Sequence, residues 1–304
     1  MNRPSPEESP LAALRDEIDE IDDTIHDLLM RRMALANRIS ETKRARGATG
    51  ALLRPAREAA ILRRLQDRHE GPFPFPVIVR IWSEIMSATL FAEGGFAVSV
   101  FTVEEPSEES RFPDLARVYF GAETPLITAR TESGVLRGVR DGKASIGVLP
   151  VPADAMSGDV GVSAEPWWLT LAVSDEERPM IVSRLPWLAG GRHAAGKTNA
   201  LVVAMTPPAP SGDDVSYLAV ESSDTISRDR IRSALAVAGI AVTGSVAWHG
   251  DGGAPGRWQL IEVDGFVAEG DERLQNFAEK LGDDVGRIAV LGSYPRPPAP
   301  ARAG

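Results

Sequence analysis

The chain of 304 residues contains no cysteine, which excludes disulfides and thiolate metal sites and fits a reducing compartment. Its four histidines, His26, His69, His193 and His249, show no spacing typical of metal ligands, and we expect neither a metal nor another cofactor. No apolar run approaches transmembrane length, and the polar segment Met1–Ser9 lacks the apolar centre of a signal peptide. These absences predict a cytoplasmic protein without a membrane partner.

Positive charge is also scarce. The chain has 33 Lys and Arg against 43 Asp and Glu, a net charge of −10. Residues 1–93 carry 14 basic and 15 acidic side chains, so most of the negative charge lies in the remainder. An acidic chain without a basic block argues against nucleic acid as a partner. The length predicts two or three domains.

The most regular pattern lies in residues 9–43. Apolar side chains alternate at steps of three and four, which predicts a long helix with a narrow apolar seam for packing against other helices. Ser9 is a suitable N-cap, and Pro10 suits the first turn. The seam consists of Leu11, Leu14, Ile18, Ile21, Ile25, Leu28, Leu35 and Ile39.

Arg32 occupies a seam position where the pattern requires an apolar residue. A charge on an apolar seam is costly unless it has a partner. Lys43 lies three helical turns further along nearly the same face, and Arg15 lies beside the seam near the start of the helix. Three cations along one side suggest a partly buried pocket for an anion with more than one negative charge. The alternative is that they are solvated surface charges whose apolar stems lie along the helix.

Two shorter helices are expected to follow, at about 54–69 and 77–93. Three helices, one of them this long, cannot bury the seam within a single chain, which predicts a homodimer. The second helix begins with Arg54, Arg57 and Glu58. Thr89 and Glu93 are four residues apart and therefore share one face of the third helix.

From residue 95 the pattern changes to an α/β arrangement. Strands are expected at 96–101, 146–150, 167–173 and 200–205, with a helix at about 134–140. A linker rich in proline follows at 207–212. Residues 215–294 then read as strand, helix, strand, strand, helix, strand, an order that fits a ferredoxin-like α+β domain.

Residues 191–198, Gly-Arg-His-Ala-Ala-Gly-Lys-Thr, match the phosphate-binding P-loop pattern. A P-loop must open a helix whose N-terminus faces the phosphate. Residues 200–205 have the composition of a strand, so we do not expect a nucleotide site.

Residues 9–93 resemble the all-helical class of chorismate mutase. The resemblance implies a three-helix domain that forms an intertwined dimer and converts chorismate to prephenate. It rests on Leu11–Asp19, Arg31–Ala36, Lys43, Arg54–Glu58 and Ile85–Leu90.

The resemblance also implies roles for individual residues. Arg32 would bind one substrate carboxylate, Arg15 of the partner subunit would bind the other, and Thr89 would contact a carboxylate. Glu58 would contact the ring hydroxyl, whereas Lys43 and Glu93 would contact the ether oxygen. The catalytic residues would thus be Lys43, Glu93 and Arg32, with Arg57 also in the site and Arg54 standing where some relatives have Asp.

This chemistry needs no metal, nucleophile or proton shuttle, because the rearrangement is unimolecular. The protein must hold a compact conformer and stabilise the charge that develops on the ether oxygen. Glu93 stands where relatives often have Gln, and it can donate a hydrogen bond only when protonated. We therefore predict that activity falls as the pH rises past neutrality and that Glu93→Gln flattens this profile.

The remainder resembles prephenate dehydratase followed by its regulatory ACT domain, on residues 120–121, 142–150, 258–265 and 291–295. The predicted domains are a mutase domain at 9–94, a degenerate dehydratase-like α/β domain at 95–206 and an ACT-like domain at 214–296.

Several dehydratase and ACT motifs are changed. The dehydratase motif Thr-Arg-Phe is replaced by Thr198-Asn199-Ala200, and an early Gly-Thr-Phe is missing around Phe101-Thr102. The ACT motif Glu-Ser-Arg-Pro is missing near 246–248. We expect a chorismate mutase whose dehydratase-like part is inactive. The alternatives are a working bifunctional mutase–dehydratase and a non-catalytic sensor or interaction protein on the same scaffold.

Overall fold

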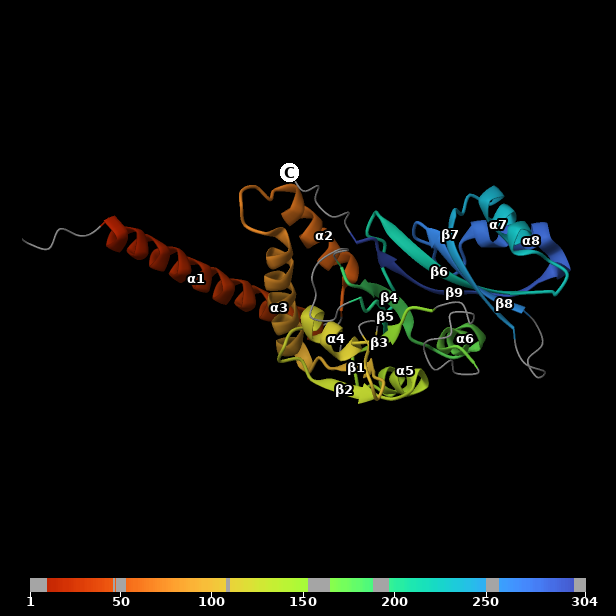
Figure 1. Cartoon of the computed structure of the whole chain (residues 1–304), viewed down its shortest axis with the longest axis horizontal. Coiled ribbons are helices and arrows are strands. Elements are labelled where there is room, and N and C mark those ends of the chain that lie inside the picture. Colours follow the sequence, from red (N-terminus) through yellow and green to blue (C-terminus); the bar gives the residue numbers. More distant parts are fainter. Residues whose placement is uncertain are drawn as a thin grey trace, which may run out of the picture.

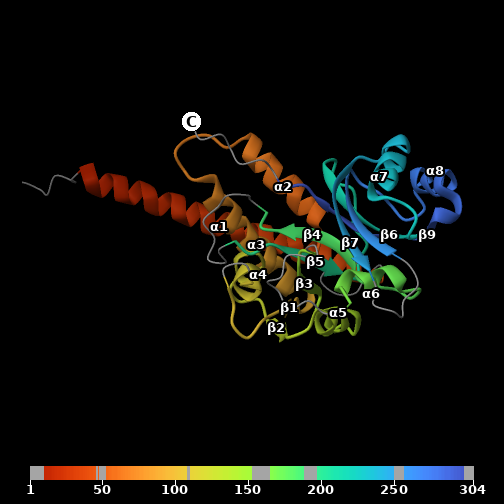
Figure 2. The same ribbon diagram turned by 45° about the vertical axis from the view of Figure 1, so that its right-hand side comes forward.

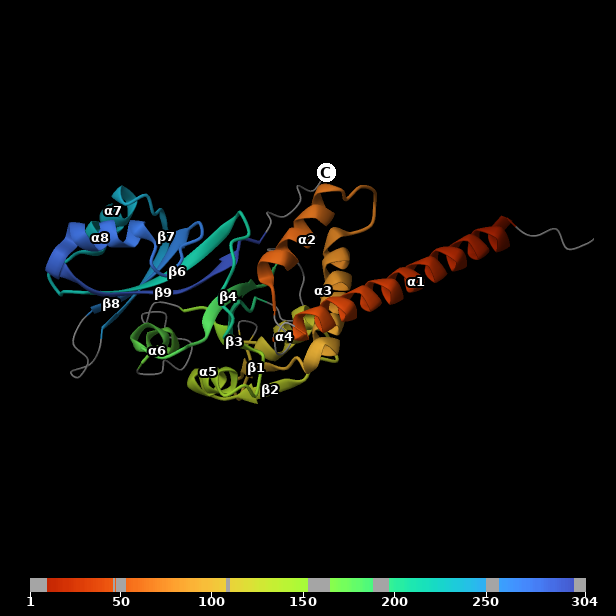
Figure 3. The ribbon, with the colours of Figure 1, turned by 180° about the vertical axis from the view of Figure 1, so that it is seen from behind.

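The computed structural model describes residues 10–45, 47, 53–107, 110–152, 165–187, 197–249 and 257–297. Three helices come first: α1 (Pro10–Arg44), α2 (Pro55–Asp67) and α3 (Phe75–Gly94). Their bounds agree with the predicted helices to within two residues. Much of α1 projects away from the rest of the molecule, as three views show (Figure 1, Figure 2 and Figure 3).

Helix α3 connects the helical domain to the layer that follows. It contacts α1, α2 and α4, and its C-cap is Gly95, which has a left-handed φ of 81°. By length and composition alone α3 is apolar enough to cross a membrane, contrary to the expectation that no run reaches that length. The side chains buried along one face of α3 are Phe75, Val79, Ser83, Ser87 and Leu90.

An α/β layer follows. Strand β1 pairs in parallel with β2 and β3, and β5 pairs antiparallel with β3 and β4. The elements are β1 (Val98–Phe101), α4 (Phe112–Phe120), β2 (Leu126–Ala129), α5 (Glu132–Arg140), β3 (Ile146–Pro150), α6 (Trp167–Val173), β4 (Met180–Leu185) and β5 (Ala200–Ala204).

Residues 167–173 form helix α6, so the predicted strand there is wrong. Five of its seven side chains are buried, and Pro166 occupies the N-cap position. A short segment that is apolar on every face has no periodicity that separates a buried helix from a buried strand. Strands β2 and β4 were not expected from the sequence either.

The last unit has the predicted element order. Its strands form the antiparallel order β9-β6-β8-β7, the ferredoxin-like arrangement, and α7 and α8 lie together on one face of these strands (Figure 1). The elements are β6 (Asp214–Ser222), α7 (Arg228–Val237), β7 (Val242–His249), β8 (Arg257–Asp264), α8 (Glu272–Leu281), the 3-10 turn Gly282–Asp284 and β9 (Val285–Pro295).

One sheet crosses the boundary that we predicted at 206–214. Strand β4 pairs in parallel with β9 through Ile181 and Gly292, giving a nine-stranded order β2-β1-β3-β5-β4-β9-β6-β8-β7. Gly292 has a φ of 134°, and a Cβ atom there would lie 2.1 Å from the carbonyl oxygen of Ile181. Glycine therefore permits the close approach of these strands. Leu201, Leu260 and Leu291 belong to the same apolar core.

Candidate functional site

A cavity of about 270 Å³ lies between α1, α2 and α3. Its walls combine apolar side chains with three guanidinium groups and two carboxyl groups, the composition of a small-molecule site. The apolar lining residues are Leu35, Ala36, Ile39, Ile61, Met86 and Leu90. The polar lining residues are Arg32, Arg54, Arg57, Glu58, Thr89 and Glu93.

Arg32 is held in place on the cavity wall. Its Nη1 donates a hydrogen bond of 2.9 Å to Oγ1 of Thr89, and that hydroxyl donates one of 2.8 Å to the carbonyl oxygen of Ile85. Burial and the neighbouring guanidinium of Arg57 lower the pKa of Arg32 below its usual value, although an arginine remains charged at neutral pH. Two like charges facing one cavity favour the binding of an anion there.

Glu58 lies between this cavity and a second one of about 40 Å³ on the side of the α/β layer. Burial raises the pKa of Glu58 to about 7. The carboxyl group is therefore divided between its neutral and ionised forms near neutral pH. Sequence reasoning proposed Glu58 as a contact but missed this shift, because α4 and β4, which contribute to the surroundings of Glu58, are distant in sequence.

Six of the eight residues proposed from the sequence line the larger cavity; the other two are Arg15 and Lys43. Arg15 is exposed in the second turn of α1. It is 17 residues from Arg32, which corresponds to about 25 Å along the helix axis. Arg15 therefore cannot reach the cavity of its own chain. Lys43 lies on α1, but its side chain is outside the described part of the structure.

The apolar seam of α1 is exposed from Leu11 to Ile39 in the single chain. The members of this seam are between 49% and 58% exposed. An apolar stripe of this length is far larger than scattered surface hydrophobes and marks an interaction surface. Its members are Leu11, Leu14, Ile18, Ile21, Ile25, Leu28, Leu35 and Ile39.

The P-loop pattern lies largely outside the described residues, which resume at Lys197. Thr198, the last residue of the pattern, is buried, and its Oγ1 accepts a 2.9 Å hydrogen bond from the backbone N–H of Arg111. Strand β5 begins at Ala200, so a strand follows the pattern where a phosphate site requires a helix. Within the described ranges, no group of three His, Asp or Glu side chains is placed to hold a metal.

The helical segment that forms the cavity matches the family model for chorismate mutase type II over residues 14–93. Residues 14–93 are a chorismate mutase type II domain. Every described residue that lines the cavity lies within this mutase domain.

Similar curated proteins are bifunctional enzymes. The chain is 32% identical over 148 residues to the bifunctional chorismate mutase/prephenate dehydratase of Neisseria gonorrhoeae, covering 48% of this chain and 38% of that protein. The enzyme of the same name from Stutzerimonas stutzeri is 30% identical over 149 residues, covering 48% and 40%. The matched part thus spans about two fifths of the length of these relatives.

Similar solved structures include prephenate dehydratase from Streptococcus mutans, with 14% identity and a TM-score of 0.45, covering 66% of this chain and 97% of that one. Prephenate dehydratase from Arthrobacter aurescens has 14% identity and a TM-score of 0.45, covering 68% and 94%. A quorum-quenching acylase, GqqA, has 16% identity and a TM-score of 0.46, covering 65% and 94%. These values are too low to support an assignment of function.

Proposed function

We propose that the protein is a chorismate mutase that converts chorismate to prephenate. The observation that carries this proposal is the cavity of the mutase domain, where Arg32, Arg57 and Thr89 form a preorganised anion site. Arg32 and Thr89 bind one carboxylate of the substrate, and Glu58 contacts the ring hydroxyl. Fixed cations of this kind select a compact conformer without forming a covalent intermediate.

Lys43 and Glu93 stabilise the ether oxygen as its bond breaks. Glu93 lines the cavity, four residues beyond Thr89 on α3. The backbone of Lys43 lies in the last turn of α1, beyond Ile39 of the cavity wall. Arg54, the residue before α2, lines the cavity and adds positive charge that attracts a dianion.

The second carboxylate is bound by Arg15 of a partner subunit in a homodimer. Three features support this arrangement: the exposed seam of α1, the exposure of Arg15 and its distance from the cavity of its own chain. Two antiparallel α1 helices that bury the seam from Leu11 to Ile39 would place Arg15 of one helix opposite about residue 35 of the other, and Leu35 lines the cavity.

The C-terminal part, dehydratase-like and ACT-like, is catalytically inactive. Thr198, at the altered dehydratase motif, is only 2% exposed and is occupied by the hydrogen bond from Arg111. The side-chain amide of Asn199 donates to the carbonyl oxygen of Lys197 at 2.9 Å. Thr198 thus ties the loop before β5 to the start of α4, and Asn199 makes a contact within that loop.

The experiment that tests the proposed function follows chorismate, prephenate and phenylpyruvate with the purified full chain. We expect chorismate to disappear and prephenate to accumulate without phenylpyruvate. Enzymatic formation of phenylpyruvate would establish the bifunctional alternative, which the names of the curated relatives favour. No turnover of chorismate would reject the mutase and favour a sensor or interaction protein.

The affinity for chorismate should depend on pH through Glu58. Above about pH 7 the carboxyl group of Glu58 is increasingly ionised, and its negative charge repels the substrate dianion. We therefore expect KM to rise as the pH increases through 7, and Glu58→Gln to flatten this rise. Steady-state kinetics from pH 5.5 to 9 measures the effect.

Glu93→Gln is the matched variant, because Glu93 lines the same cavity and must be protonated to donate to the ether oxygen. Glu93→Gln should leave the pH dependence of KM unchanged if Glu58 controls it. If neither variant changes the pH dependence of wild type, both roles are wrong.

A further inference from the structure

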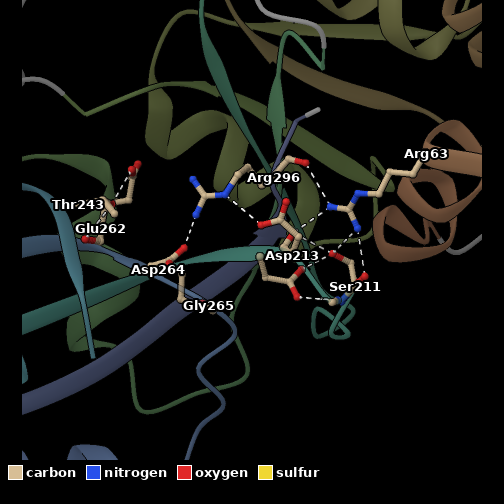
Figure 4. Close-up of polar contacts among 11 residues, drawn as sticks. Arg63, Ser211, Asp213, Thr243, Glu262, Asp264, Gly265 and Arg296 are labelled. Carbon is tan, nitrogen blue, oxygen red and sulfur yellow. Dashed lines mark hydrogen bonds and ion pairs between the residues drawn. The ribbon is translucent and has the colours of Figure 1, made fainter. Parts of the chain in front are cut away.

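Arg63 connects the mutase domain to residues far away in the sequence. It lies on α2, five residues after Glu58. Its Nη1 donates to the carbonyl oxygen and to Oγ of Ser211 at 3.0 and 3.3 Å, and its Nη2 donates to the carbonyl oxygens of Asp213 and Arg296 at 2.9 and 3.2 Å (Figure 4). One guanidinium thus binds both the segment before β6 and the residue after β9.

The acceptors of Arg63 are themselves fixed. The carboxylate of Asp214 is buried and accepts from the backbone N–H and Oγ of Ser211 at 2.8 and 2.6 Å. The backbone N–H of Arg296 donates to the carbonyl oxygen of Asp213 at 2.8 Å, and its Nε donates to the carboxylate of Asp213 at 3.0 Å (Figure 4). Arg63 therefore enters a preorganised set of oxygen atoms, which reduces the entropy lost when it binds.

Helix α2 is also packed against the α/β layer. Ala59 and Leu62 are buried in one apolar cluster with Trp187, which follows β4. Ser183 and Leu185 of β4 line the small cavity behind Glu58. The helix that carries Arg57 and Glu58 is thus held by parts of the chain outside the mutase domain.

We propose that Arg63 is a positioning residue for the cavity, which anchors α2 to the start of β6 and the end of β9 and so fixes Arg57 and Glu58. The inference rests on the proposed mutase function. In this proposal, the C-terminal half of the chain contributes to the site by holding α2, which forms one wall of the cavity. A shift of about 1 Å in a catalytic group can reduce a rate by up to roughly 100-fold, so loss of the anchor should be measurable.

The test compares Arg63→Met with Arg64→Met in the full chain. Arg64 is the exposed neighbour on the same helix, so its substitution removes the same charge without touching the anchor. We expect kcat/KM for chorismate to fall about tenfold or more in Arg63→Met and to stay within about twofold of wild type in Arg64→Met. Arg63→Lys keeps one charge but not the forked geometry and should be intermediate.

The pH profile separates positioning from general stability. If α2 moves away from β4, Glu58 becomes more hydrated, and the midpoint of the KM profile should shift below that of wild type. A smaller fraction of folded molecules or a lower Tm alone would not move this midpoint. The other titratable and charged groups that line the two cavities beside Glu58 are Arg32 of α1, Arg54 just before α2, Arg57 of α2, Glu93 of α3 and Tyr119 of α4.

Amide hydrogen exchange of residues 55–67 provides a readout that does not require activity. We expect faster exchange in Arg63→Met than in wild type and Arg64→Met. Unchanged exchange in α2, or a lower Tm with an unchanged kcat/KM and pH midpoint, would overturn the proposal. If the wild type did not turn over chorismate, the proposed function would fail, and exchange in α2 alone would decide whether Arg63 anchors the helix.

Discussion

Arg32→Met should reduce kcat/KM for chorismate by more than any other single substitution in the cavity of one chain. Arg32 supplies a fixed positive charge that Thr89 orients and burial strengthens. Removing one member of a buried, hydrogen-bonded charge pair costs about 2–5 kcal/mol, or roughly 30- to 5,000-fold in kcat/KM. Steady-state kinetics with the full chain measures the loss.

Arg31→Met is the control for this prediction. Arg31 is the preceding residue on α1, it is exposed, and it lies off the seam, so its substitution changes the net charge equally. We expect Arg31→Met to keep near wild-type kcat/KM. Equal losses of kcat/KM in the two variants would show that only the net charge of the chain matters. Wild-type kcat/KM in Arg32→Met would show that Arg32 does not bind the substrate.

Ile18→Asp combined with Ile25→Asp should abolish both dimerisation and activity. These residues are a heptad apart on the exposed seam of α1. Burying an unpaired carboxylate in an apolar interface costs several kcal/mol each, more than the interface gains from either isoleucine. The monomer would also lack the Arg15 of a partner. Light scattering and the mutase assay measure the two effects.

The matched control is Glu20→Ala combined with Asp27→Ala, which changes two exposed positions on the opposite face of α1 at the same spacing. This variant should remain dimeric and active. A protein that is monomeric before any substitution, or an Ile18→Asp/Ile25→Asp variant that stays active, would contradict the proposed dimer.

The helical domain could be predicted from the sequence because its signals are local. A seam with a period of 3.6 residues fixes α1, and the phase of Arg32 on that seam is enough to direct its side chain toward the other helices. Proline at the start of α2 and glycine at the end of α3 mark the boundaries. Six proposed residues consequently meet at one cavity.

The α/β layer was harder to predict because its strands and helices are short and buried. The apolar pattern of residues 167–173 is compatible with a buried helix and with a buried strand. Tertiary packing therefore decides that these residues form α6. Strand β4 contains Ser183 and Arg184, which interrupt its apolar pattern. Its pairing with β9 depends on Gly292, more than a hundred residues away.

Long-range contacts also determine two properties of the site that local sequence patterns do not predict, the raised pKa of Glu58 and the hydrogen bonds of Arg63. The raised pKa of Glu58 comes from burial between α2, α3, α4 and β4. The bonds of Arg63 join residues 148 to 233 positions apart. Both depend on distances between residues that are far apart in the sequence, and the sequence alone does not give these distances.

The central claim is that each site combines Arg32 of one subunit with Arg15 of the other. The direct measurement mixes Arg15→Met and Arg32→Met subunits, each inactive alone, after unfolding and refolding together. Half of the dimers would then be hybrids, and each hybrid would hold one site with both arginines intact, so the account predicts about a quarter of wild-type activity. A mixture that remained as inactive as its two components would contradict it.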